Sequence, residues 1–550
     1  MAHVLGVPAG QIGHPVTVFI LMKPDNGLLD HRRTSCGNGY NSRLLSLSRY
    51  SRRQPISEPH LSTGNANSFD AWLPRLSFLL FFLLCAGYFA VPLWDSDFWW
   101  HIASGREILQ HGIPDSDPFG VFPATDAVRN DTVLQGQWLG QVVLYTVFQA
   151  GGVNAVVALR VLVLLVCLGL VVWRGRRLGA GPLALWPMLV LLALTVESFG
   201  GERPQLLSFL FAALFFAAMD AAEQNPRCLL ALPPIALLWA NSHGGVLLGV
   251  ALLTLWTALK LLERGVPWAE RRGWLLAAGG VFLASLLTPN GLQTYLYLLD
   301  LEGSVLQART SEYVSAFRLY TLGYVWPQVW VVLFYALALI AAFALARLRQ
   351  WRPLAVTVFL GLISASSFRY FAFFLFLAGP YIARGLQDAV NTLPALPAGF
   401  RQAGQALWLL VLLGVLGTGL WRGELFRGGF YQQRYPVAIA DFVQQNHLRG
   451  RAFNTLEWGG YLLWRLTPQV TPYIDGRMLD EERFAPYTNI LWATARGIAW
   501  FEHEDFQLVI MPYHGTFDPQ RYKLLDYLRS RPRWHLLYRD AKGVVFVRDY

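Results

Sequence analysis

Charged side chains are scarce in this chain. Asp, Glu, Lys and Arg make up 15% of its 550 residues, whereas soluble domains carry roughly a quarter. Apolar residues make up 54%, so most of the chain is expected to face lipid or other membrane helices. The net charge of +10 therefore does not predict a nucleic-acid partner. The arginines lie in short loops between apolar runs, where positive charge orients a membrane protein.

Cysteine is also rare. The four cysteines lie in the N-terminal tail or in or beside apolar runs, and none falls in the polar C-terminal region: Cys36, Cys85, Cys167 and Cys228. This distribution implies no disulfide framework. The sequence also lacks metal-ligand spacing, a Walker loop, a dinucleotide fingerprint and a nucleophile elbow. No soluble-enzyme motif therefore assigns a reaction.

Long apolar runs dominate what is present. A membrane-spanning helix needs about 20 largely apolar residues, and the first run that qualifies is Leu76 to Trp94. Ten more follow at roughly 153–173, 182–199, 205–221, 228–241, 245–262, 273–288, 328–346, 353–367, 370–385 and 406–421. We therefore predict a mainly α fold, a polytopic bundle of about 11 spans over residues 71–421. Gln137 to Ala150 is predicted to be an interfacial or re-entrant helix.

Charge sets the sidedness of these spans. All five loops expected on the inner side are basic: Arg174 to Arg177, Arg227, Arg264 to Arg272, Arg347 to Arg352, and Arg384 to Arg401. Cytoplasmic loops carry the excess of Lys and Arg. We therefore predict a multi-pass protein of the inner (plasma) membrane. Its N-terminus is expected to be cytoplasmic and its C-terminal region extracytoplasmic.

The two ends of the chain differ in composition from the spans. Residues 1–70 are polar and arginine-rich, and we interpret them as a disordered cytoplasmic extension or an overcalled start of the reading frame. Residues 422–550 hold strand-like runs at 507–511, 534–538 and 543–547, with helical runs beginning near Pro436, Glu457 and Pro519. This alternation predicts an extracytoplasmic α/β domain.

Polar residues gather at the predicted outer helix ends. These are Asp95, Asp97, Trp99, Trp100, His101, Glu202, Arg203, His243 and Arg369. Each lies close to a predicted helix end at similar depth. Ionisable groups gathered on one face of a membrane bundle are more often functional than decorative. We therefore expect this ring to converge on one pocket between the helices.

Two interpretations stay open for the first part of the ring. Asp95 and Asp97 are either hydrated loop carboxylates or a functional pair. On an extended backbone, side chains two residues apart point the same way. The pair would then share a divalent cation or supply a base. Trp99 and Trp100 are either interfacial anchors or a stacking platform for a sugar.

The later cationic residues have similar alternatives. Arg203 and Arg369 either extend to outer-leaflet headgroups or hold a phosphate. Their position on the outer side, where positive charge is depleted, favours the second. His243 is either a satisfied imidazole at a helix end or a ligand-binding group. Arg160 lies inside a predicted span and needs a partner that the sequence does not identify.

Together, these motifs resemble a known family. They are Asp97-Phe-Trp-Trp-His-Ile-Ala-Ser-Gly-Arg106, Ile113-Pro-Asp-Ser-Asp-Pro-Phe119, Arg203-Pro-Gln205, Trp239-Ala-Asn-Ser-His-Gly-Gly245, Glu457-Trp-Gly-Gly-Tyr461 and Ile474-Asp-Gly-Arg477. Over roughly residues 70–550 the chain resembles a poorly characterised bacterial branch of the GT-C superfamily of polytopic membrane glycosyltransferases.

The resemblance implies a reaction. GT-C enzymes transfer a sugar from a polyprenyl-phosphate carrier to a glycan, lipid or protein acceptor on the outer face, with inversion. Inversion by direct displacement needs a base and cationic stabilisation of the leaving phosphate. On this chain the resemblance assigns the base or metal-binding role to Asp97, with Asp95 as the alternative. A divalent cation, Mg²⁺ or Mn²⁺, stays open as a cofactor held by these two carboxylates.

The remaining site residues take supporting roles by the same resemblance. Arg203, Arg369 and His243 are expected to grip the phosphate, and Glu202 to orient Arg203 or help to bind the acceptor. Trp99, Trp100 and His101 complete the expected substrate-binding set. The chain departs from the family in two places: Ser96 separates the two acidic residues, and Gln137 stands where relatives carry a carboxylate.

Two other classes of function compete with a transferase. Transporters or flippases of a lipid-linked or polar solute usually place charge near mid-membrane on broken helices, often with internal repeats. Here the charge lies at the outer ends and no repeat is evident. A non-catalytic membrane scaffold that displays the C-terminal region would leave the outer ring without a purpose.

Overall fold

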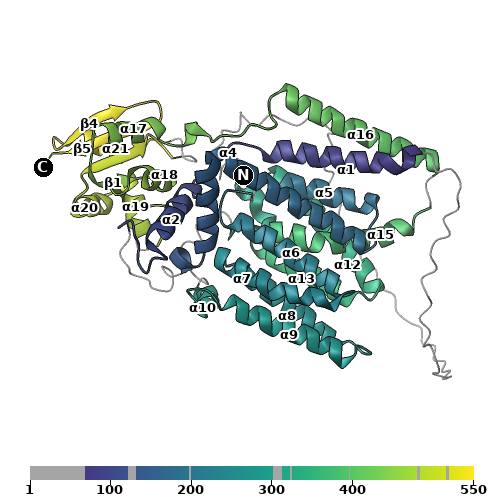
Figure 1. Ribbon diagram of the computed structural model, residues 1–550. Coiled ribbons are helices and arrows are strands. Elements are labelled where there is room, and N and C mark those ends of the chain that lie inside the picture. The colour runs from purple at the N-terminus through teal and green to yellow at the C-terminus, as the bar shows by residue number, and fades with distance from the viewer. Residues whose placement is uncertain are drawn as a thin grey trace, which may run out of the picture.

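The computed structural model describes residues 68–121, 132–196, 200–300, 313–322, 325–394, 397–479, 483–515 and 520–549. The predicted N-terminal extension lies outside these ranges, apart from residues 68–70, which begin the first helix. Figure 1 shows a bundle of long helices with a smaller α/β region at one end.

Every predicted apolar run overlaps a helix or a group of helices. The bundle consists of α1 (Ser68–Phe89), α4 (Trp138–Arg177), α5 (Pro182–Val196), α6 (Gln205–Ala222), α7 (Leu232–Ser242), α8 (Val246–Leu262), α9 (Trp268–Ser285), α12 (Val325–Arg347), α13 (Trp351–Ser366), α15 (Gly379–Asn391) and α16 (Ala398–Trp421). Shorter helices α10 (Gln293–Asp300) and α14 (Phe371–Phe373) flank them. The mainly helical class is confirmed.

Five helices in the described part of the chain are long and apolar enough to cross a membrane. They include α1, α4, α6 and most of α12 and α16. Three shorter apolar helices, α5, α8 and α13, accompany them. These helices indicate a membrane protein, and the total of 11 spans stays a prediction. In Figure 1, α16 lies along α1 at one side of the bundle.

Helix α4 joins two segments that the sequence separates. It runs through the predicted interfacial segment and the following span without a loop. At Gly151 and Gly152 its backbone leaves helical geometry, and Gly152 has φ of 63°, a conformation that glycine adopts easily. The first part, 138–150, packs against α2 (Phe98–His111). The membrane depth of this first part stays a prediction.

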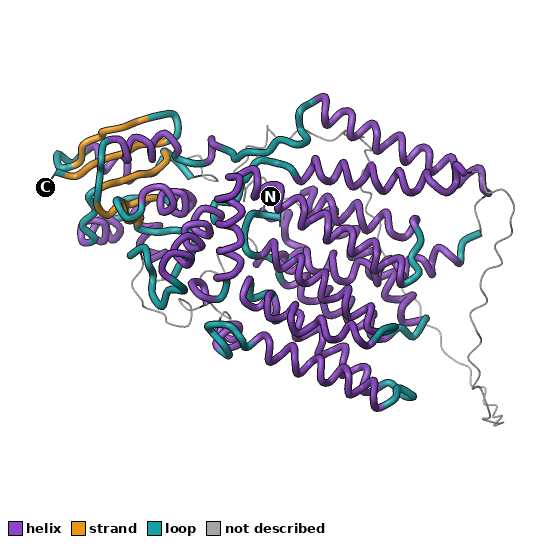
Figure 2. The backbone as a smooth tube through the Cα atoms, viewed as in Figure 1, coloured by secondary structure: helices purple, strands orange, loops and turns teal. Residues whose placement is uncertain are grey.

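The C-terminal α/β region is built on one five-stranded sheet. Its strands are β1 (Gly450–Asn454), β2 (Val470–Pro472), β3 (Leu508–Pro512), β4 (Trp534–Arg539) and β5 (Gly543–Arg548), in the order β2-β1-β3-β5-β4. The β1 strand is parallel to β2 and β3, with Ala452 opposite Leu508, whereas β5 is antiparallel to β3 and β4. Figure 2 shows that the strands are confined to this end of the molecule.

Five helices cover the sheet: α17 (Val437–Gln445), α18 (Leu456–Leu466), α19 (Phe484–Leu491), α20 (Ala495–His503) and α21 (Leu524–Arg529). The strand runs predicted near 508, 534 and 543 are present. The helices predicted near 436 and 457 are present, and α21 begins five residues after Pro519. Strands β1 and β2 and helices α19 and α20 were not anticipated.

Helix α2 joins the α/β region to the bundle. Although it directly follows the first apolar run in sequence, its apolar side chains Phe98, Trp99 and Ile102 share a core with Tyr435, Tyr461 and β-strand residues. Trp100 and Ala103 belong to a second core with Phe453 and Tyr473. The first loop and the C-terminal region therefore fold as one packed unit, beside the start of α4 (Figure 1).

Buried ion pairs hold the opposite end of the bundle together. Arg174 near the end of α4 contacts Asp220 of α6, with 2.6 Å between Nε and Oδ2. The Asp220 carboxylate also accepts a hydrogen bond from the hydroxyl of Tyr381. Lys260 bridges Glu223 and Glu270 at 2.8 and 2.6 Å. Arg174 and Asp220 are both buried, whereas buried Lys260 lies between two partly exposed carboxylates, and we interpret these ion pairs as structural.

Candidate functional site

Asp95 and Asp97 both bind the guanidinium of Arg203. The Asp95 Oδ2 atom lies 2.5 Å from Arg203 Nε, and Asp97 Oδ2 lies 3.2 Å from Arg203 Nη1. Asp95 Oδ1 also accepts a hydrogen bond from the backbone N–H of Asp97 at 3.0 Å. The loop after α1 and the turn before α6 are thus joined by one arginine fork, the geometry that suits carboxylate recognition.

The three side chains differ in exposure. Asp95 is 2% exposed, whereas Asp97 and Arg203 are 21% and 29% exposed. Asp95 is therefore enclosed by its partners. Asp97 and Arg203 are partly exposed, so their carboxylate and guanidinium groups are accessible to a ligand.

The local backbone explains why two acids separated by Ser96 meet one arginine. The extended backbone considered from the sequence is not present at Asp97, which has φ −76° and ψ −20° and directly precedes α2. The turn over residues 95–97 wraps the two carboxylates around the guanidinium. Gly201 permits this approach, because a Cβ atom there would lie 2.2 Å from Asp95 Oδ2.

Two histidines lie in the electrostatic field of Arg203. Burial lowers the pKa of His101 well below its ordinary value, and the charge of Arg203 lowers it further. Burial and the charges of Arg369 and Arg203 lower the pKa of His243 to about 3. Both imidazoles are therefore neutral near pH 7, so they act as hydrogen-bonding groups and not as cations.

Hydrogen bonding assigns the tautomer of His243. Its Nδ1 atom accepts the backbone N–H of Gly245 at 2.9 Å. Since the neutral ring carries one proton, that proton is on Nε2, which is a donor. His101 Nδ1 lies 3.5 Å from Gln141 Nε2, and its ring stacks on Trp100 with 3.6 Å between centroids.

Arg369 approaches this group from the last part of the bundle. It lies in the short helical turn Phe368–Tyr370. It hydrogen-bonds to the hydroxyl of Tyr313, and its guanidinium carbon lies 4.8 Å from the centroid of that ring. Its charge acts on His243. Ion pairs thus join Asp95, Asp97 and Arg203, and electrostatic interactions link His101, His243 and Arg369 to the same group.

Glu202 has a different partner from the rest. It forms a buried ion pair with Arg160, the arginine inside a predicted span whose partner the sequence did not identify. Arg160 also donates to the carbonyls of Phe89 and Val91 after α1. Burial raises the pKa of Glu202 to about 7, although the charge of Arg160 opposes the shift. Glu202 therefore anchors the turn that carries Arg203.

The two tryptophans are buried in protein. Trp99 is surrounded by Phe430, Tyr435 and Tyr461, with ring centroids 5.6, 5.4 and 4.9 Å away. These edge-to-face contacts belong to the core between α2 and the α/β region. Trp100 is also buried, and its Nε1 has no hydrogen-bond partner among the described residues. Neither indole presents an open face for a sugar ring.

The C-terminal region supplies contacts that sequence reasoning missed. Arg434 donates from Nη1 to the carbonyl of Trp94 at 3.0 Å, and the hydroxyl of Tyr435 donates to the carbonyl of Asp95 at 3.2 Å. The signal for Arg434 was present, since it is an arginine on the predicted outer side. These contacts fix the backbone on which both carboxylates are mounted.

The two carboxylates do not fit a resident divalent cation as they stand. Mg²⁺ requires near-octahedral oxygen ligands at about 2.0–2.1 Å. Here Asp95 and Asp97 face a shared guanidinium, which occupies the position that a cation would take. Among the described residues, no group of three or more His, Cys, Asp or Glu side chains is arranged to hold a metal. We derive no step through a metal ion.

Comparison with solved structures identifies the fold. An oligosaccharyltransferase from Archaeoglobus fulgidus, in complex with Zn and sulfate, matches with a TM-score of 0.54 and 12% identity over 80% of this chain and 68% of that one. The fold resembles that of an archaeal oligosaccharyltransferase. The same fold recurs in oligosaccharyltransferase AglB from Archaeoglobus fulgidus in complex with an inhibitory peptide and a dolichol-phosphate, with a TM-score of 0.51 and 10% identity over 81% of this chain and 70% of that one.

The structural neighbours are members of the GT-C superfamily, which the sequence motifs also resemble. No family model and no curated protein matches the sequence. At 10–12% identity the likeness establishes the fold. The residue roles must be argued from this chain's own geometry.

Proposed function

We propose that this protein is an integral membrane glycosyltransferase. It transfers a sugar from a polyprenyl-phosphate-linked donor to an acceptor on the outer face of the membrane, with inversion. The observation that carries the proposal is the pair of carboxylates held on Arg203, with two neutral imidazoles and Arg369 in the same electrostatic group, on an oligosaccharyltransferase-like fold.

Asp97 is the proposed base. It is the more exposed carboxylate, and a base must reach the hydroxyl or amide proton of the acceptor. In the proposed step, Asp97 takes this proton while the acceptor atom bonds to the anomeric carbon. The bond between that carbon and the phosphate oxygen breaks, and the electron pair leaves with the phosphate. Asp95, enclosed by Arg203 and the Asp97 backbone, is the proposed positioning residue.

Arg203 and Arg369 are the proposed phosphate-binding cations. A sugar phosphodiester carries one negative charge, whereas the departing phosphomonoester carries up to two. Guanidinium groups aimed at the phosphate therefore stabilise the transition state more than the bound donor. His243 is neutral with its proton on Nε2, so it would donate a hydrogen bond to a phosphate oxygen without adding charge.

The ligands of one structural neighbour support this class of donor. That oligosaccharyltransferase holds a dolichol-phosphate and an inhibitory peptide, which are a lipid phosphate and a polypeptide. For the present chain we propose a polyprenyl-phosphate sugar and a glycan, lipid or protein acceptor. We place the protein in the plasma membrane, with its α/β region and the site on the extracytoplasmic side and its N-terminus in the cytoplasm.

The direct test is sugar transfer by the purified full-length protein. The protein is reconstituted in liposomes and given polyprenyl-phosphate sugars with an extract of membrane acceptors. We expect transfer by the wild-type protein and a loss of at least 100-fold in Asp97→Asn, with equal amounts of folded protein. Asp115→Asn is the matched control, because it removes an exposed carboxylate from the same loop. Full activity of Asp97→Asn would remove Asp97 from the mechanism.

A further inference from the structure

One segment of the α/β region directly touches Asp97. A Cβ atom at position 476 would lie 2.1 Å from Asp97 Oδ1, 3.1 Å from Asp97 Cγ and 3.0 Å from Trp100 Nε1. Gly476 therefore brings the main chain into contact with the proposed base, and any side chain there would force the carboxylate to move. The other face of the same carboxylate holds Arg203.

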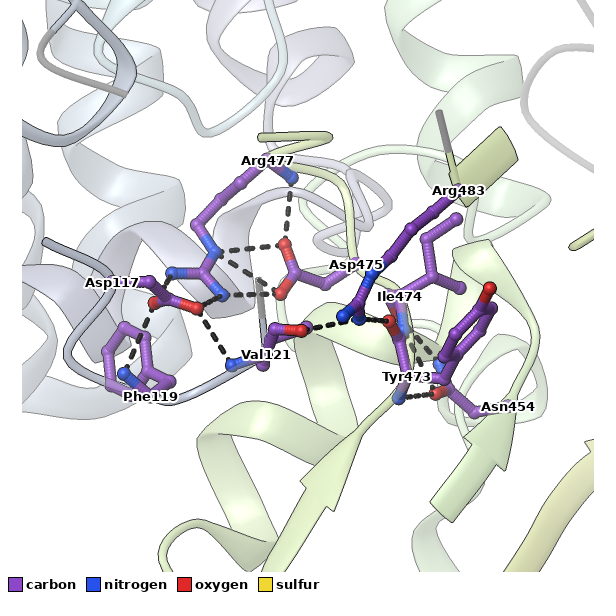
Figure 3. Close-up of polar contacts among 9 residues, drawn as sticks. All are labelled: Asp117, Phe119, Val121, Asn454, Tyr473, Ile474, Asp475, Arg477 and Arg483. Carbon is purple, nitrogen blue, oxygen red and sulfur yellow. Dashed lines mark hydrogen bonds and ion pairs between the residues drawn. The ribbon is translucent and has the colours of Figure 1, made fainter. Parts of the chain in front are cut away.

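Buried ion pairs fix this segment on both sides of Gly476. Arg477 contacts Asp475, with 2.6 Å between Nη2 and Oδ2 and 2.9 Å between Nε and Oδ1. It also contacts Asp117 of the first loop, with 2.5 Å between Nη1 and Oδ1. None of the three side chains is more than 3% exposed. Figure 3 shows Arg477 between the two carboxylates.

Asp117 in turn organises its own loop. Its carboxylate accepts the backbone N–H groups of Phe119 and Val121 at 3.1 and 2.8 Å. The ring of Phe119 lies against the guanidinium of Arg477, 4.9 Å from its centroid. Arg483 then donates to the carbonyls of Val121 and Tyr473, which joins the loop to the segment after β2 (Figure 3).

Arg477, Asp117 and Asp475, together with Gly476, form what we call the clamp. A clamp that served stability alone would not need to lie beside the site. Replacing a buried ion pair with well-packed apolar side chains is often neutral or stabilising, so stability alone does not account for it. The ion pairs add a defined geometry, because a bidentate guanidinium fixes both the distance and the angle between its partners. Here the fixed element is the main chain that confines Asp97.

We propose that Arg477 is a positioning residue for sugar transfer, which through Asp117, Asp475 and Gly476 holds the Asp97 carboxylate in its reactive orientation. The inference rests on the proposed function. Misplacement of a reacting group by about 1 Å lowers a rate on the order of 100-fold. Loosening the clamp therefore lowers kcat and leaves donor binding, which depends on Arg203 and Arg369, nearly unchanged.

Kinetics of two mild variants test the positioning role. Arg477→Lys keeps the charge and loses the fork, and Asp117→Asn keeps one acceptor oxygen for the two loop N–H groups and loses the charge. We expect each to lower kcat at least tenfold, with KM for the lipid-linked donor within twofold of wild type. The matched control is Arg451→Lys, which alters an ion pair with Glu504 on the outer surface of the same region.

Gly476→Ala tests the contact itself. Its kcat should fall at least as far as that of Asp117→Asn, since the new methyl group displaces the carboxylate. Gly181→Ala is the control, because a Cβ atom there would also make a close contact, 2.8 Å from a side-chain oxygen of Gln387. Neither Gly181 nor Gln387 belongs to the candidate site. Unchanged kcat in all three clamp variants, or an equal fall in the controls, would overturn the inference.

A disulfide test separates this inference from the proposed function. In a background with the native cysteines replaced by Ser, Asp97→Cys with Gly476→Cys should form a bond on mild oxidation. A Cβ atom at 476 would lie 3.1 Å from Asp97 Cγ, the position that a cysteine sulfur at 97 would take, which suits disulfide geometry. His111→Cys with Gly476→Cys is the negative control, at the far end of α2. No bond in the first pair would sink the inference and leave the proposed function standing. Bond formation with no transfer by the wild-type protein would sink the proposed function and the positioning role together.

Discussion

Arg160 and Glu202 form an ion pair in which neither side chain is more than 2% exposed. The pair joins α4 to the turn before α6, and through the carbonyls of Phe89 and Val91 it also holds the end of α1. Three segments distant in sequence are therefore fixed by one guanidinium. Arg203 directly follows Glu202 in the sequence. The position of this proposed phosphate-binding cation therefore depends on the buried pair.

Removing Glu202 should destabilise the protein strongly. Glu202→Ala leaves a buried guanidinium without its counter-charge, a change that lowers the free energy of unfolding by about 3–5 kcal/mol. Thermal unfolding in detergent measures the loss. Glu504→Ala, which breaks a partly exposed ion pair with Arg451, should change stability by about 1 kcal/mol or less. Equal shifts in the two variants would contradict the buried-pair interpretation.

Arg203→Lys should impair transfer although it conserves charge. A lysine ammonium is a point charge, whereas the arginine fork meets Asp95 and Asp97 from separate nitrogens. We expect kcat/KM for the donor to fall at least tenfold in the reconstituted assay. Arg451→Lys serves as the control for a general effect of the exchange. Wild-type kinetics in Arg203→Lys would mean that the fork is not required.

Asp95 and Asp97 should differ in the consequences of their substitution. Asp97→Asn removes the proposed base and should abolish transfer with little change in thermal stability, because Asp97 is partly exposed. Asp95→Asn weakens the enclosed contact with Arg203, so we expect a lower melting temperature and a partial loss of kcat. The reverse pattern would exchange the two roles.

His243 should add a pH-dependent component to stability. Its pKa is lowered from the ordinary value of 6.5 to about 3 in the folded protein by burial and by Arg369 and Arg203. The folded state therefore binds this proton more weakly than the unfolded state, and stability falls as pH drops from 6.5 towards 3. Asn at position 243 offers an acceptor for the Gly245 N–H but does not titrate. Unfolding measured between pH 7 and pH 4 should show a steeper loss in the wild type than in His243→Asn, whereas parallel curves would contradict the shift.

Sidedness can be tested with single cysteines. Gly244 and Arg264 are exposed and lie on opposite sides in the predicted topology. In a background without native cysteines, an impermeant thiol reagent should label Gly244→Cys in intact cells and Arg264→Cys only after permeabilisation. Labelling in the opposite order would invert the topology and move the site to the cytoplasmic side.

Much of the bundle could be predicted because its signal is local. Each apolar run is defined by consecutive residues, so all 11 predicted runs overlap helices. The kink in α4 was harder to foresee, because Gly151 and Gly152 adopt non-helical backbone angles that join its two helical parts without a loop. Strand β1 was missed because its sequence, Gly450 to Asn454, lacks the β-branched residues that mark β3 and β5.

The site shows where such local signals end. The ring of outer polar residues was visible because each lies beside a helix end. The partner of Arg160 and the contacts of Arg434 depend on chain segments tens to hundreds of residues apart. The tryptophans of α2 show the same limit: their sequence fits a membrane interface, but the C-terminal aromatic residues bury Trp99. Burial by a segment that is distant in the sequence produces no periodic pattern in the local sequence.

The shared core of α2 and the α/β region also determines when the protein can finish folding. The apolar face of α2 emerges from the ribosome after about the first hundred residues, but its packing partners extend to Val545. This face therefore stays without its full set of packing partners until more than four hundred further residues have been synthesised and have crossed or entered the membrane. A truncated chain would therefore leave the apolar face of α2 exposed beside the bilayer. Such a chain would be prone to aggregation and proteolysis.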